Sequence, residues 1–133
     1  MKQISREWLD AASDDLLTIE SIINNPGLTN IAAFHAQQAI EKSLKALIED
    51  KSLPFVRTHN IQTLVLRIED YVVLNVNEMV IAELDRLYID ARYPGELGLM
   101  PSGKPTLEEA RGYYSEARNI YSQVKDLLFE GEK

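Results

Sequence analysis

The sequence contains no cysteine and only two histidines, His35 and His59. The lack of cysteine excludes disulfides, thiolate zinc sites and cysteine nucleophiles, and it fits a reducing compartment. Two histidines are few for a metal site. We therefore expect no bound metal and no cofactor.

Long apolar runs are also missing. The first fifteen residues, MKQISREWLDAASDD, contain no apolar core of the kind found in signal peptides. No later run approaches the roughly 20 apolar residues that a membrane span requires. We expect a soluble, cytoplasmic protein, and its 133 residues fit one domain over 1–133.

Positive charge is scarce. The chain has 14 Lys and Arg against 21 Asp and Glu, a formal charge of −7. A field of this sign repels polyanions, so we expect no non-specific DNA binding. Any contact with a nucleotide or nucleic acid must come from a local cluster of cations.

The usual catalytic motifs are absent from the sequence. It has no P-loop, no glycine-rich dinucleotide fingerprint and no nucleophile elbow. General acid–base catalysis needs a positioned histidine or carboxylate, and no pair here has a spacing that requires one. The balance favours a protein that is not an enzyme.

Residues 31–48, IAAFHAQQAIEKSLKALI, predict the helix around which the chain is organised. It contains no glycine or proline, and its apolar side chains form one stripe suited to a core. A second, polar stripe lies roughly opposite. The apolar stripe consists of Ala33, Ala36, Ile40, Leu44, Leu47 and Ile48, and the polar stripe of His35, Gln38, Lys42 and Lys45.

Similar periodicity predicts an all-α protein, an antiparallel up-and-down helical bundle of four to five helices. The run YVVL at 71–74 resembles a strand, but a lone strand has no partner, so we assign it to a helix. Residues 93–105 form a long loop of a kind that is often functional or mobile. The expected helices cover 4–23, 30–49, 59–74, 78–92 and 106–130, each within about two to four residues.

Local sequence also suggests how these helices begin. Thr106 and Glu109 have the spacing of a capping box at the start of the last helix. Candidate N-caps for the first three helices are Ser5, either Thr29 or Asn30, and Thr58.

The last helix carries a second apolar stripe of Tyr113, Ile120 and Leu127 beside its main one. Together the two stripes are wider than one groove of a small bundle requires. This width predicts a homodimer, or else a surface that binds a different protein.

Four segments together resemble one family: WLDAASDDL, FHAQQAIEKSLKALI, RTHNI and YIDARYP, in this order over nearly the whole chain. The resemblance is to the HEPN domains of bacteria and archaea. It implies a bundle of four or five helices, commonly a homodimer. It also implies frequent pairing with a minimal nucleotidyltransferase in what looks like a toxin–antitoxin system.

The ribonuclease members of that family carry an arginine followed, after four to six residues, by a histidine. Neither histidine here has such an arginine, because residues 28–31 read LTNI and residues 52–55 read SLPF. The chain therefore resembles the branch with an RYP motif, for which nucleotide binding has been proposed. The alternative is a metal-independent ribonuclease toxin with a degenerate active site.

The candidate nucleotide ligands lie at positions that a bundle would bring together. The start of the third helix and the end of the fourth share one end of an up-and-down bundle, so cations and an aromatic ring could meet one anion there. Structural roles are the alternative at these positions. Lys42 and Lys45 could form a solvated face, and Arg92 could interact only with its own helix end. His35 could make a hydrogen bond between helices, and His59 could bond backbone or a carboxylate. The candidates are Arg57, His59, Arg92, Tyr93 and Lys45, with His35, Gln38 and Lys42 as secondary ones.

Overall fold

The computed structural model describes residues 1–54, 56–92 and 103–130, with the backbone alone for 89–92. The described residues form helices and turns with no strand, which confirms the prediction of an all-helical bundle. The elements are α1 (Gln3–Ile22), the short 3-10 helix η1 (Pro26–Leu28), α2 (Thr29–Asp50), α3 (Ile61–Ile68), α4 (Glu78–Arg92) and α5 (Leu107–Glu130).

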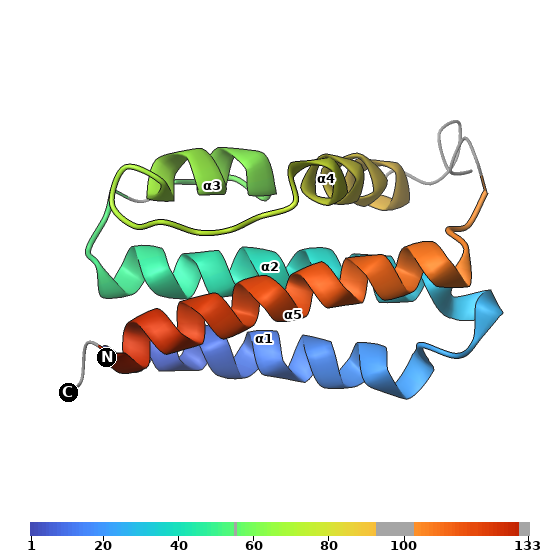
Figure 1. The fold of residues 1–133 in the computed structure, drawn as a ribbon, viewed down its shortest axis with the longest axis horizontal. Coiled ribbons are helices and arrows are strands. Elements are labelled where there is room, and N and C mark those ends of the chain that lie inside the picture. Colours follow the sequence, from blue (N-terminus) through green and yellow to red (C-terminus); the bar gives the residue numbers. More distant parts are fainter. Residues whose placement is uncertain (55, 93–102, 131–133) are drawn as a thin grey trace.

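Helix α2 is the centre of the molecule and contacts every other helix. Figure 1 shows α1, α2 and α5 running lengthwise together, with α3 and α4 on the other side of α2. Helix α1 runs antiparallel to α2, whereas α5 runs in the same direction as α2. The chain returns through α3 and α4 before α5 begins, and α4 crosses the long helices.

The predicted apolar stripe of α2 is core: all six of its side chains are buried. Further alanines, at 32, 39 and 46, are buried on the rest of its circumference. Small side chains allow neighbouring helices to approach closely from several sides. As a consequence the polar residues Gln37, Glu41 and Ser43 are buried too, and each has to find a hydrogen-bond partner.

Helix α3 ends at Ile68, so the helical assignment of 71–74 was wrong. Residues 73–77 run without helix or strand, and Val72, Leu74 and Val76 pack against the core while Val73 is exposed. That alternation is the signature of an extended chain. Three apolar anchors spaced two residues apart stabilise this course more than another turn of helix would.

The capping predictions divide in two. The Thr106 and Glu109 capping box is confirmed: the Thr106 amide donates to Glu109 Oε1 at 2.9 Å, and the Glu109 amide donates to Thr106 Oγ1 at 3.0 Å. The other three N-cap predictions were wrong. Lys2, Leu28 and Asn60 precede α1, α2 and α3, because those helices begin earlier or later than expected.

The wide apolar face of α5 packs against other helices of the same chain. Tyr113 and Ile120 of the second stripe are buried, and Leu127 is half-buried. The surface that suggested a homodimer is therefore mostly covered by α2, α1 and α4. The homodimer therefore stays a prediction, and the apolar face of α5 no longer supports it. Among the described residues, no helix combines the length and apolarity needed to cross a membrane.

Candidate functional site

Most side chains of the polar stripe of α2 bind to one of two buried carboxylates. The first belongs to Asp15 of α1, whose side chain is 8% exposed. His35 Nδ1 and Lys42 Nζ each lie 2.8 Å from one of its oxygens. One acid thus holds an imidazole and an ammonium group, which satisfies the need of a buried charge for partners.

The second carboxylate is Glu41 of α2, whose side chain is 5% exposed. Its Oε1 lies 2.9 Å from His59 Nδ1, and its Oε2 accepts from Lys45 Nζ at 3.2 Å. Gln37 Nε2 donates to the His59 carbonyl at 2.8 Å, and Gln38 Nε2 donates to Gln37 Oε1 at 2.7 Å. These bonds attach the segment before α3 to the centre of α2.

Both histidines therefore present the same chemistry. A carboxylate accepts hydrogen bonds but does not donate them, so each Nδ1 carries the proton and donates it. The remaining Nε2 atoms make no hydrogen bond within the part of the chain described. The side chains of His35 and His59 are 26% and 51% exposed. Each oriented ring can donate to an external anion when protonated, or accept a proton when neutral.

Aromatic rings connect the two imidazoles. His35 contacts Phe34 edge to face with ring centroids 5.4 Å apart. Phe34 stacks on Tyr88 of α4 at 6.1 Å and 16°, and Tyr88 meets His59 at 5.8 Å. These four rings, called the aromatic row below, bridge α2, α4 and the segment before α3. Phe34 is 39% exposed, so part of one aromatic surface is open to a planar ligand.

The start of α3 is fixed to α4 beside this row. The amides of Ile61 and Gln62 donate to the two carboxylate oxygens of Asp85 at 2.8 and 3.1 Å, while Asn60 Oδ1 accepts from the Thr63 amide at 2.9 Å. Burial raises the pKa of Asp85 despite these two backbone hydrogen bonds. The position of His59 therefore depends on α4 as well as α2.

The six predicted ligands with described side chains form two groups and one lone residue. His59 and Lys45 meet at Glu41, while the secondary candidates His35 and Lys42 meet at Asp15. Gln38 joins the first group through Gln37. Arg57 is exposed and has no hydrogen bond or ion pair among the described residues.

The other two candidates are the last residue of α4 and the residue that follows it in the sequence. The backbone of Arg92 ends α4, one helical turn after Tyr88, but its side chain is outside the described part. Tyr93 and the rest of the predicted loop up to 102 also lie outside it. Their convergence with His59 stays a prediction.

Sequence reasoning did not include Asp15, Phe34, Tyr88 or Glu41 among the candidate site residues. A signal for Asp15 was present: it lies three residues after Ala12 and four before Ile19, within the apolar stripe of α1. A carboxylate at a core position needs a cationic partner. No comparable pattern in the sequence indicated that Phe34 would contact Tyr88.

The arrangement suits an anion better than a cation. Each buried acid is matched by a lysine and a histidine, so protonation of either ring gives its group a net positive charge. No cluster of three or more potential metal ligands occurs within the described residues. The chemistry available is hydrogen bonding to oxyanions, proton transfer at imidazole and stacking on aromatic rings.

The fold is similar to two solved structures. One is an archaeal HEPN homologue, with a TM-score of 0.70 and 24% identity over 96% of this chain and 98% of that chain. The other is the protein TT1696 from Thermus thermophilus, with a TM-score of 0.68 and 27% identity over 94% of this chain and 98% of that chain. No curated protein matches the chain.

Residues 5–127 match the HEPN domain family, which is most of the chain. The chain therefore belongs to the HEPN domain family, as its four sequence segments indicated.

Proposed function

We propose that this HEPN-domain protein binds a nucleotide without cleaving RNA, at the surface formed by the polar stripe of α2 and the aromatic row. One observation carries the proposal: two imidazoles, each oriented by a buried carboxylate, lie at the two ends of a row of aromatic rings. A base can stack on the open part of Phe34 while phosphate oxygens accept from the rings and from nearby cations.

The cations fit this division of roles. Lys42 and Lys45 are 24% and 18% exposed and already pair with the carboxylates. Their role is therefore to balance the negative charge of these two acids. Arg57 is exposed and unpaired among the described residues, and it is only two positions from His59. Arg57 is thus available for a phosphate. Arg92 belongs to the same proposal because it ends α4 one turn beyond Tyr88, and Tyr93 is the next residue in the sequence.

Calorimetric titration with ATP, ADP and AMP tests the proposal. His59→Ala should weaken binding by roughly 1–3 kcal/mol, the size of a lost charged hydrogen bond, and Arg92→Ala should do the same. Glu41 keeps Lys45 in the His59→Ala variant, so the fold should be retained. Arg67→Ala, at an exposed cation near the end of α3, is the control and should leave affinity unchanged. Absence of heat with every nucleotide would refute nucleotide binding.

The aromatic part of the site has a closely matched control. Phe34 and Phe129 are 39% and 37% exposed, but only Phe34 belongs to the aromatic row. Phe34→Ala should weaken nucleotide binding by about 1 kcal/mol, roughly fivefold, through lost stacking. Phe129→Ala should have no effect on the same titration. Equal losses in the two variants would exclude a stacking role for Phe34.

A second candidate function is a metal-independent ribonuclease with a degenerate active site. It is favoured by the two histidine–carboxylate pairs, since such a pair can act as a general acid or base. The missing arginine-to-histidine spacing opposes it. An RNA-degradation assay separates the two functions. Cleavage that disappears in both His35→Ala and His59→Ala would show catalysis at this site and refute binding without cleavage.

Family membership also supports two proposals about assembly. We propose a homodimer and, in the cell, a minimal nucleotidyltransferase partner in a toxin–antitoxin-like pair. The absence of cysteine fits the reducing cytoplasm as the location. Light scattering tests the first proposal, because a monomer of 15.1 kDa at micromolar concentration would exclude the homodimer.

A further inference from the structure

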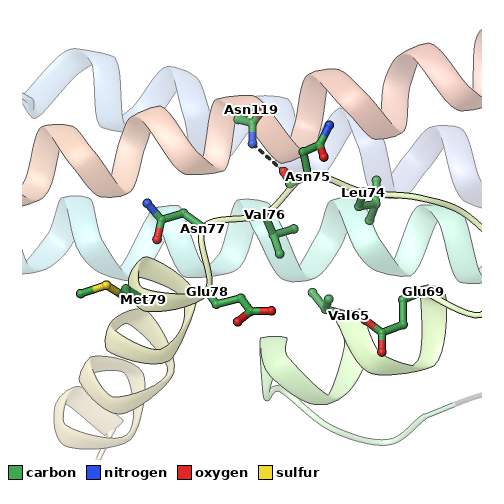
Figure 2. A pocket seen from close by; sticks show the side chains of 9 residues that line it. All are labelled: Val65, Glu69, Leu74, Asn75, Val76, Asn77, Glu78, Met79 and Asn119. Atoms are coloured by element: carbon green, nitrogen blue, oxygen red, sulfur yellow. Dashed lines mark hydrogen bonds between the residues drawn. The ribbon is translucent and has the colours of Figure 1, made fainter.

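A groove lies at the other end of α3 and α4, away from the aromatic row. It has a volume of about 700 Å³ and shares no residue with the histidine site. Figure 2 shows it between the end of α3, the extended segment 74–77 and the start of α4. The lining residues that matter here are Val65, Glu69, Val76, Glu78, Met79 and Asn119.

One wall of the groove is fixed by side chains of α5. The Asn75 carbonyl accepts from Asn119 Nδ2 at 3.0 Å and from Gln123 Nε2 at 2.8 Å. The Asn77 amide donates to Glu116 Oε2 at 2.7 Å. These bonds fix the extended segment at Asn75 and Asn77, so the groove is preformed and a ligand would not have to order it.

The charge in the groove is negative and uncompensated. Glu69 and Glu78 are exposed, and neither has an ion pair within the residues described. Figure 2 shows their carboxylates on either side of Val65, one from each helix. Two carboxylates separated by an apolar floor are complementary to cations that flank an apolar side chain.

Exposed apolar side chains extend this floor. Met79 is 83% exposed and Leu66 is 62% exposed. Leu66 lines a smaller adjoining cavity of about 220 Å³, which also includes Glu69 and Glu78. Large apolar side chains left in water beside a preformed groove are typical of protein-binding surfaces.

We propose that this groove docks a segment of another protein that carries lysine or arginine residues next to apolar side chains. A second copy of this chain is the alternative occupant, and self-association that depends on the groove would reveal it. Nucleic acid is excluded by the sign of the charge in the groove. The inference does not rest on nucleotide binding, since the two surfaces use different residues.

A synthetic helical peptide of about 14 residues, containing leucine and lysine at amphipathic spacing, is a suitable probe. Its binding is followed by fluorescence anisotropy against the whole protein. Glu69→Gln with Glu78→Gln should weaken binding roughly tenfold. Glu7→Gln with Asp10→Asn removes the same charge from exposed positions on α1 and should weaken it less than twofold.

Amide chemical shifts of the unmodified protein locate the peptide independently of any variant. Changes around Val65, Leu66, Val76 and Met79 are expected, whereas changes centred elsewhere would overturn the proposal. Equal weakening by the two double variants would overturn it too, because binding would then follow net charge alone. Self-association lost in Leu66→Ser would show that a second copy occupies the groove, which contradicts the proposed partner.

Discussion

Acidic residues have opposite environments at the two ends of the layer formed by α3 and α4. At the histidine site, Asp15 and Glu41 are 8% and 5% exposed, and each is paired with a lysine and a histidine. At the groove, Glu69 and Glu78 face water without ion pairs among the described residues. A buried carboxylate needs cations for its own stability, while an exposed one is hydrated and needs none.

This difference determines which ligand each end can accept. At the histidine site the acids orient the imidazoles, so the groups left for a ligand are Nε2 atoms and cations. At the groove the carboxylates themselves are left for a ligand. One chain of net charge −7 therefore carries one local surface suited to an anion and another suited to a cation.

The largest difference between the two ends should be in stability. Asp15→Ala leaves Lys42 and His35 without their acid in a half-buried position, so we expect the free energy of unfolding to fall by about 2–4 kcal/mol. Urea unfolding measures this loss. Asp14→Ala changes the neighbouring, exposed aspartate and should cost less than about 0.5 kcal/mol. Similar losses in both variants would contradict a structural role for the buried pairing.

The Asp85 carboxylate, which anchors the start of α3 beside the histidine site, gives a smaller effect. Asp85→Ala removes the acceptor for two backbone amides and should lower the free energy of unfolding by about 1–2 kcal/mol. The same variant should broaden amide signals at both ends of α3. Val65→Ala, near the other end of α3, should leave the His59 region unchanged.

The pH dependence of Asp85 has a definite sign. Burial raises its pKa in the folded protein, with a further rise from the nearby Glu41 charge. The stability that this group contributes is fully present below its unfolded pKa and is lost as pH rises through the folded pKa. The wild type should therefore lose stability relative to Asp85→Asn as pH rises through this window. A difference that moves in the other direction would contradict the raised pKa.

The smallest effect belongs to the groove. Glu69→Gln with Glu78→Gln should change the free energy of unfolding by less than about 1 kcal/mol, because both side chains are solvated and only Glu78 lies at a helix start. Thermal unfolding measures it beside Asp15→Ala. A loss as large as that of Asp15→Ala would remove the contrast between the two ends.

Local patterns were sufficient for most of the secondary structure. The long helices were predicted within one residue at each end, because their apolar periodicity extends over many turns. The pairing of His35 with Asp15 was not predicted, although Asp15 interrupts an apolar stripe. A stripe shows that a residue faces the core but does not show which side chain of another helix meets it.

The sequence by itself determined that the chain is helical, that α2 is central and that its polar stripe is distinct from its core. These features depend on spacing along one helix. Only the tertiary structure decided that 69–77 leaves the helix, that Phe34 stacks on Tyr88 and that Glu41 is shared by Lys45 and His59. Those features depend on residues many positions apart, and their energy is available only when the helices have packed.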